Sequence, residues 1–176
     1  LEQAVVLAPD YADAHAALAR TWSNLTQYST LSFKDALPSV LAEAHKALAL
    51  DPTNVSALIA LANVDLFEGR NAEARKGFQR AIELDPSNAS AHLDYALVLP
   101  SKQALAETLE AVRLDPDSAT AQNNLGALYL NLGAYQKALA PSLMLAKLSP
   151  HSASSAFGLA KNYALLHRDQ DAINAF

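Results

Sequence analysis

The chain contains no cysteine, which excludes disulfide bonds and thiolate metal sites and leaves the redox compartment undetermined. It also lacks an apolar run of about 18 residues, the length needed to cross a bilayer. Its first residues do not form the charged-then-apolar pattern of a secretory signal. We therefore expect a soluble chain, with the cytoplasm favoured, while a parent protein is free to carry a membrane segment elsewhere.

Basic residues and glycines are scarce as well. The 13 Lys and Arg are outnumbered by 18 Asp and Glu, and a net charge of -5 argues against a nucleic-acid surface. The 5 glycines form no phosphate-cradling loop, and no strand is expected that could carry a nucleophile elbow. The sequence thus predicts a protein that is not an enzyme, with no cofactor and no metal site.

Alanine, leucine and valine supply most of the apolar residues, which make up 51% of the chain. The stretch ARKGFQRAIELDPSNASAH, residues 74–92, has the pattern of a helix end, a proline turn and the start of the next helix. Related stretches surround prolines that lie 43, 34, 30 and 34 residues apart, namely Pro9, Pro52, Pro86, Pro116 and Pro150. Such self-similarity indicates a repeat protein built from pairs of helices.

A period of 34 residues with an Ala…Leu-x-Pro ending resembles the tetratricopeptide repeat, a pair of antiparallel helices. The resemblance implies an all-α fold, a right-handed superhelix or α-solenoid, as a single domain over residues 1–176. A partial repeat at 1–9 is followed by full repeats at about 12–52, 55–86, 89–116 and 119–150, and by a partial repeat at 153–176. Both ends divide a repeat, so we expect a fragment of a longer array.

Three repeats depart from the regular pattern. The first has nine surplus residues, which predict a helix over about 10–24 and then a long loop over 26–34. The third is four residues short, and the deficit is expected between its helices, near Pro100. In the fourth, Pro141 falls inside the second helix and predicts a bend or an interruption there.

Candidate metal ligands and glycosylation sites have simpler interpretations. His15 and His92 hold equivalent repeat positions, without a second ligand at metal-binding spacing on the same helix, and are expected to pack structurally. Asn54 and Asn88 belong to Asn-x-Ser triplets, but each stands where a helix begins. There the asparagine side chain caps unpaired N–H groups.

Function is expected on the concave surface, which the first helices line in the resembled family. Polar side chains at the corresponding positions are Arg20, Asn63, Asp94, Asn123, Asn124, Asn131 and Lys161. A helix face that is merely exposed to solvent also carries polar residues, so the alternative is that these side chains are solvated and bind no ligand. We expect a non-catalytic scaffold that binds a peptide or protein segment. Asp65 and Asp94 favour a partner with a neutral or basic middle.

Two binding modes of the resembled family fit poorly. Chaperone-binding members grip a C-terminal carboxylate with lysines, and neither register of this chain supplies them. The asparagine ladder of glycosyltransferase-associated members is matched only at Asn124.

An alternative concerns the parent protein. The long first repeat resembles arrays attached to bacterial winged-helix regulators and adenylate cyclases, which would make the chain a sensory or oligomerisation segment. End-to-end self-association is also expected, because the last helix would expose Ala172, Ile173 and Phe176.

Overall fold

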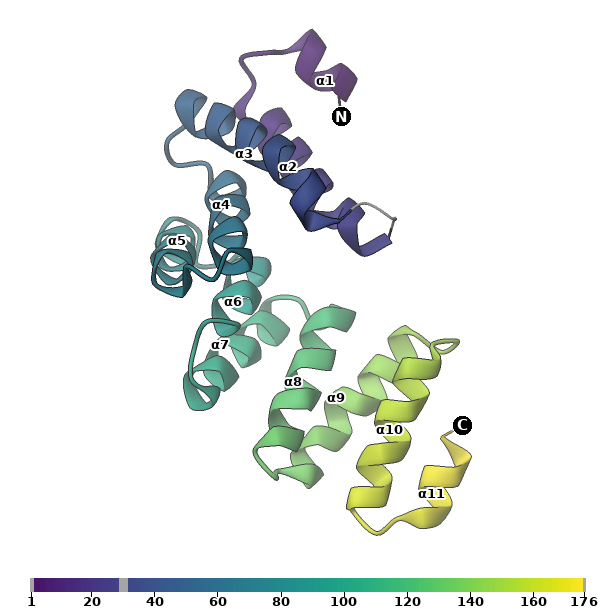
Figure 1. The fold of residues 1–176 in the computed structure, drawn as a ribbon. Helices are drawn as coiled ribbons and strands as arrows, with labels where there is room; N and C mark the ends of the chain where they lie inside the picture. The colour runs from purple at the N-terminus through teal and green to yellow at the C-terminus, as the bar shows by residue number, and fades with distance from the viewer. Residues whose placement is uncertain (1, 29–31, 176) are drawn as a thin grey trace. The chain divides into compact units, whose positions relative to one another are not determined.

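The computed structural model describes residues 2–28 and 32–175, and its fold is all-α, as expected. Over those residues it forms helices and turns and no strand (Figure 1). The helices are α1 (Glu2–Leu7), α2 (Ala12–Tyr28), α3 (Phe33–Leu50), α4 (Val55–Phe67), α5 (Asn71–Leu84), α6 (Ala89–Ala96), α7 (Ser101–Leu114), α8 (Ala119–Asn131), α9 (Tyr135–Leu148), α10 (Ala153–Leu165) and α11 (Asp169–Asn174).

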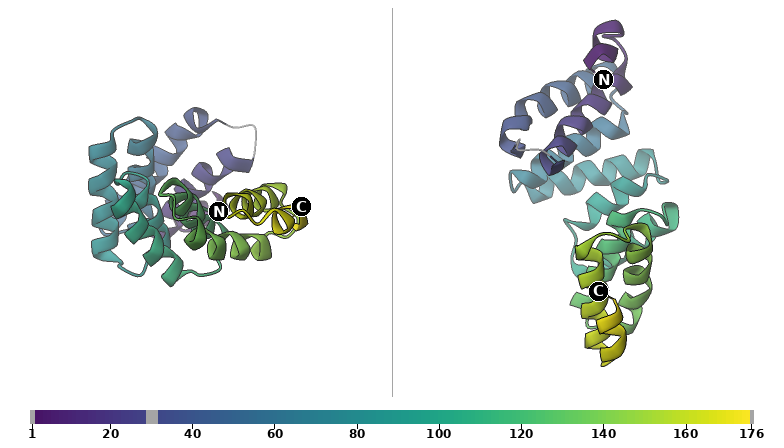
Figure 2. Two further views of the ribbon diagram at one scale, coloured as in Figure 1. Left: turned by 90° about the horizontal axis from the view of Figure 1, so that it is seen from below. Right: turned by 90° about the vertical axis from the view of Figure 1, so that its right-hand side faces the viewer.

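The chain divides into two compact units, which are described separately. The first unit, Leu1–Val98, contains α1 to α6, and the second, Leu99–Phe176, contains α7 to α11. In the second unit α8 and α9 form one helical hairpin and α10 and α11 another (Figure 2). The expectation of one domain over the whole chain stays a prediction.

The first helices begin at side-chain caps. The Asn54 side-chain oxygen accepts the backbone N–H of Ala57 at 3.0 Å, and Asn88 does the same for Ala91 at 3.1 Å. Serine takes over this role at the start of α8 and α10. Each cap satisfies one of the N–H groups that a helix start leaves unpaired, so the predicted capping role of both asparagines is confirmed.

A second side chain ties each of three proline turns to the following helix. Nε2 of His15 donates to the Pro9 carbonyl at 2.9 Å, and Nε2 of His92 donates to that of Pro86 at 3.0 Å. In the fourth repeat Gln122 makes the same bond, 2.8 Å to the Pro116 carbonyl. Both histidines are buried, so their predicted structural role is confirmed. Gln122 is not among the residues that the sequence predicted for this role.

Left-handed residues end three of the first helices. Gly69 and Gly133 have φ of 77° and 70°, and their N–H groups return to carbonyls of the last turn. A residue without Cβ adopts this conformation at no steric cost. His167 holds the same repeat position after α10 with φ of 56°.

The surplus of the first repeat lengthens its helices. α2 has 17 residues and α3 has 18, whereas α4 and α5 of the second repeat have 13 and 14. The predicted loop over 26–34 is therefore wrong for its helical parts, while residues 29–31 lie outside the described residues. Packing explains the longer helix α3, because its first residue, Phe33, places its ring 4.4 Å from that of Phe67. The richness of this segment in Ser and Thr predicts the loop, and nothing in the sequence indicates the contact between Phe33 and Phe67.

The deficit of the third repeat shortens its first helix. α6 has only 8 residues and ends at Ala96, and α7 begins directly after Pro100. The loss thus falls at the end of the first helix, and the predicted loss in the connection is wrong, because the connection over 97–100 is one residue longer than that over 68–70. The sequence shows only that the loss precedes Ala104, which is buried and where the pattern resumes.

Pro141 does not interrupt the second helix of the fourth repeat. α9 is one continuous helix, so the predicted interruption is wrong. Proline cannot donate to the carbonyl four residues earlier, that of Lys137, but this residue is exposed and water can take the place of the missing donor. One residue further on, the Ser142 hydroxyl donates to the Ala138 carbonyl at 2.8 Å.

The partner helix leaves room for the proline ring. Pro141 is buried, and a Cβ built on Gly126 of α8 would lie 3.9 Å from its Cγ. In the second repeat the equivalent pair is reversed in size: Ala62 stands on α4 and Gly77 on α5. A Cβ on Gly77 would lie only 2.8 Å from Cβ of Ala62, so α8 and α9 leave room for a proline at the position where α4 and α5 admit only a glycine.

Candidate peptide-binding faces

The predicted groove residues all lie on first helices, but they fall into two sets. Arg20, Asn63 and Asp94 belong to α2, α4 and α6 of the first unit. Asn123, Asn124 and Asn131 on α8 and Lys161 on α10 belong to the second unit. Each unit therefore presents its own candidate face.

In the first unit the structure brings Asn63 and Asp94 together. Nδ2 of Asn63 donates to Oδ2 of Asp94 at 3.0 Å, and both side chains are half-buried. Burial raises the pKa of the Asp94 carboxyl above its ordinary value, and the bond from Asn63 offsets part of that rise. Arg20 is exposed, and within the described part of the chain it has no hydrogen-bond or ionic partner.

Asp65 differs from Asp94, although the sequence alone does not distinguish the two. Its Oδ1 accepts from Nε and Nη2 of Arg70 at 2.8 and 2.6 Å, and Arg70 also pairs with Glu68. The expectation that Asp65 helps to repel an anionic partner is therefore weakened, since Arg70 offsets its charge. Asp94 is left as the carboxylate on this face without a cation among the described residues.

Replacing Asp94 with asparagine is expected to stabilise the protein at neutral pH. The folded state holds the Asp94 proton to a higher pH than the unfolded chain does, so stability falls as pH rises from the unfolded pKa through the folded pKa. The amide introduced by Asp94→Asn would keep a hydrogen bond to Asn63 without the buried charge. We expect a gain of about 1 kcal/mol at pH 7, measured by urea unfolding.

The pH dependence distinguishes this explanation from a general effect. Below the ordinary Asp value of 3.8, Asp94 is protonated in both states and the advantage of the Asp94→Asn variant should disappear. An advantage of the same size at neutral and at strongly acidic pH would contradict the proposed cause.

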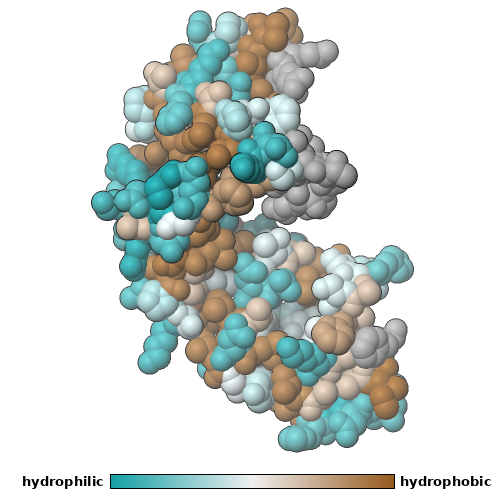
Figure 3. Space-filling view, in the orientation of Figure 1, coloured by the Kyte–Doolittle hydropathy of each residue, from teal (hydrophilic) through white to brown (hydrophobic). Residues whose placement is uncertain are grey.

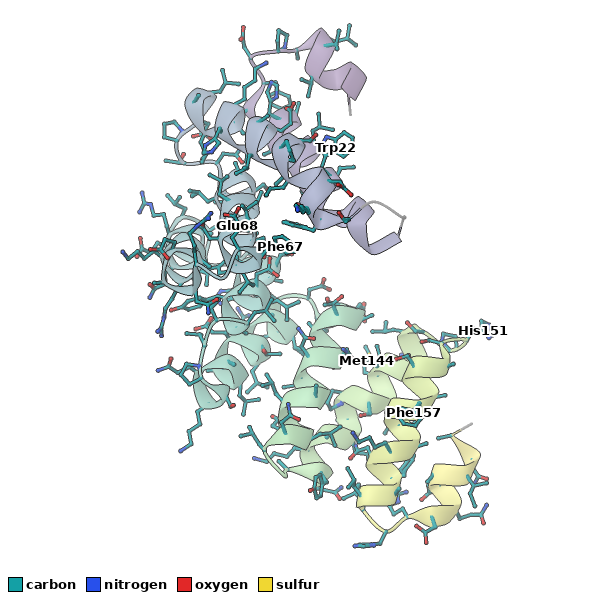
Figure 4. All side chains as sticks on the ribbon, in the orientation of Figure 1. Trp22, Phe67, Glu68, Met144, His151 and Phe157 are labelled. Atoms are coloured by element: carbon teal, nitrogen blue, oxygen red, sulfur yellow. The ribbon has the colours of Figure 1, made fainter. Side chains whose placement is uncertain are left out.

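The first unit also contains aromatic side chains on α2, α3 and α4. Phe67 is 55% exposed although its ring packs on that of Phe33, and Trp22 lies nearby on α2 (Figure 4). Trp22 and Phe33 pack against the buried core of the first unit. The first unit therefore presents one exposed aromatic ring, that of Phe67, four residues after Asn63 on α4.

The second unit contains a small hollow among α8, α9 and α10. It has a volume of about 90 Å³, and its lining is partly polar and partly apolar. The polar side chains are Gln122, Asn123, Ser142, Ser154 and Ser155. On the face of this unit that Figure 3 shows, polar and apolar side chains are interspersed and form no continuous apolar patch. Of the predicted residues, only Asn123 borders the hollow.

The other predicted residues of this unit lie outside the lining. Asn124 is half-buried, and Asn131 and Lys161 are exposed. Within the described residues none of these three, nor Asn123, has a hydrogen-bond or ionic partner. Their donors and acceptors are thus available to a ligand.

Sequence reasoning missed the serines of the hollow. Ser142 and Ser155 are small side chains whose exposure depends on how α9 and α10 pack, and periodicity alone does not report this. The signal present in the sequence was the small-residue stripe of Gly126 and Gly158, which both border the hollow. Apolar contact surface is added nearby by Phe157, which is 61% exposed (Figure 4).

Metal-binding clusters and membrane spans are both absent from the described residues. In the part of the chain that the structure describes, no three His, Asp or Glu side chains gather in a way that could hold a metal ion. None of the described helices combines the length and the hydropathy needed to cross a membrane. On α11, Ile173 is 67% exposed, and self-association through this end stays a prediction.

Comparison with known proteins identifies the repeats. Residues 107–140 match the family model described as tetratricopeptide repeat. The TPR repeat-containing thioredoxin TTL4 of Arabidopsis thaliana is 40% identical over 80 residues, which are 43% of this chain and 12% of the relative. Residues 107–140 are therefore identified as a tetratricopeptide repeat, and the chain is similar to tetratricopeptide-repeat proteins.

Solved structures agree with this fold. PilF of Pseudomonas aeruginosa aligns with a TM-score of 0.77 at 22% identity, over 93% of this chain and 74% of that one. YrrB, described as a TPR protein with an unusual peptide-binding site, aligns with a TM-score of 0.65 at 22% identity, over 99% and 87%. The fold is that of an α-helical repeat protein. Since the chain spans only about an eighth of the curated relative, that relative's own activity is not carried over.

Proposed function

We propose that the first helices of this chain hold an extended segment of a partner protein. The observation that carries the proposal is the hollow in the second unit, which Asn123 borders. Asn124 on α8 and Lys161 on α10 have no hydrogen-bond or ionic partner among the described residues. An asparagine amide both donates and accepts hydrogen bonds, as a peptide backbone does. Such contacts give affinity without requiring one particular partner sequence.

The hollow is suited to a small part of a ligand. At about 90 Å³ it accommodates one short side chain rather than a small-molecule cofactor, whose pockets measure about 300–1,000 Å³. The exposed ring of Phe157 extends the apolar surface beyond it. A peptide that lies across α8 and α10, with one side chain inserted, fits these dimensions. The peptide-binding site described for YrrB, whose fold is similar, supports the proposal.

Truncating the polar residues of this face is expected to weaken partner binding. Asn123→Ala, Asn124→Ala and Lys161→Ala should each cost about 0.5–1.5 kcal/mol, the usual net contribution of a hydrogen bond. A pulldown with the chain would first supply a partner, and calorimetric titration of each variant against it would measure the loss.

Lys137→Ala is the matched control. Lys137 is exposed on the second helix α9 and does not border the hollow. If this control abolishes binding while the three face variants bind like the parent, the partner lies on another surface and the proposal is wrong.

A further inference from the structure

We propose that Asp94, held by Asn63, anchors a positively charged side chain, lysine or arginine, of the bound partner. This inference rests on the proposed function, because it assigns the chemistry of the ligand on the first unit's face. The bond of 3.0 Å from Nδ2 of Asn63 to Oδ2 orients the carboxylate and leaves Oδ1 without a partner among the described residues.

The fold itself does not require an acid at this position. The equivalent residues of the other four repeats are small or neutral: Ala17, Ala60, Asn124 and Gly158. A half-buried carboxylate without a cation is costly, since burial opposes its charge. Carboxylates with this perturbation gather at functional sites. A cation brought by a ligand would remove the cost.

The surroundings suit a cation at the end of a long aliphatic stem. Leu97 lies one helical turn beyond Asp94 and is 58% exposed, and Phe67 lies one turn beyond Asn63 and is 55% exposed. Residues three or four apart share one face of a helix. The methylene groups of lysine or arginine would cover these two side chains while the charged head reaches Asp94. Phe67 also offers its ring to the cation.

The anchor is tested with short peptides on the complete chain. The probes are acetyl-Ala-Ala-Leu-Arg-Leu-Ala-Ala-amide and the same peptide with citrulline, the neutral isostere, in place of arginine. Both are titrated into the ¹⁵N-labelled protein while the Asn63 side-chain amide and the backbone amides of Asp94 and Leu97 are followed by NMR. We expect the arginine peptide to bind about tenfold more tightly, and the preference to shrink with added salt.

Two variants interpret the result. Asp94→Asn keeps the shape of the side chain and should remove the preference for arginine, while a thermal melt shows that it remains folded. Lys137→Ala, on the other unit, should leave the preference unchanged. Equal binding of the two peptides, no movement of the Asn63 and Asp94 signals, or an undiminished preference in Asp94→Asn would each overturn the anchor.

Failure of the anchor and failure of the proposed function give different results. If arginine and citrulline peptides bind alike but Asn123→Ala and Asn124→Ala still weaken the partner found by pulldown, the peptide face stands without this anchor. If those variants also bind like the parent, both proposals are wrong.

Discussion

Substituting alanine for Gly77 is expected to destabilise the protein by about 1–3 kcal/mol, although alanine is the better helix former. A Cβ at this position would lie 2.8 Å from Cβ of Ala62 on α4. The obstacle is the first carbon of a side chain and cannot rotate away, so the helices must separate. Urea unfolding of the variant would measure the loss.

Two other glycines provide the controls. A Cβ on Gly158 of α10 would meet nothing within 4 Å, and one on Gly126 of α8 would meet Ser142 at 3.7 Å, an ordinary contact. Alanine at either site should therefore stabilise, by up to about 1 kcal/mol, through helix propensity. If all three substitutions stabilise alike, the close contact of Gly77 is not as the structure has it.

Leucine in place of Ala81 is expected to cost about 1–3 kcal/mol. Ala81 is fully buried on α5, which packs against both α4 and α6. A branched side chain would be forced between closely spaced helices and would push its neighbours from their preferred rotamers. Thermal or urea unfolding reports the change.

Ala172 offers the matched comparison. In the last repeat it holds the other small-residue position of the second helices, the one equivalent to Ala74, and it is only half-buried on α11. The same substitution there should have a smaller effect. Equal losses at the two sites would show that burial of Ala81 is not the cause.

The helices and their order could be predicted from the sequence because their signals are local. An asparagine three residues before the N–H that it caps, as Asn54 stands to Ala57, is visible without knowledge of the fold. The spacing of prolines and small residues reports the repeat in the same way. The deficit of the third repeat could likewise be placed before Ala104, where the pattern resumes.

Features that depend on a neighbouring helix could not be predicted. Pro141 is tolerated because α8 leaves room for its ring, and the extended α3 is held by a ring on α4. At the candidate site, the sequence placed Asn63 and Asp94 on the same surface but not in contact. Nor did it distinguish Asp94 from Asp65, whose charge Arg70 offsets. Each of these features depends on a contact between two helices, and the periodicity of a single helix carries no information about such contacts.

The closer approach of α5 to α4 than of α9 to α8 at these positions bears on recombination of the repeats. A chimera that joined α4 to α9 at the spacing of α4 and α5 would press the proline ring onto the Ala62 methyl group, in a space that already excludes a single Cβ. The reverse chimera, α8 with α5, would set glycine against glycine and leave a void. The unit that can be duplicated or transplanted is therefore the whole helical hairpin, which keeps the contact between its two helices. Single helices cannot be exchanged between repeats.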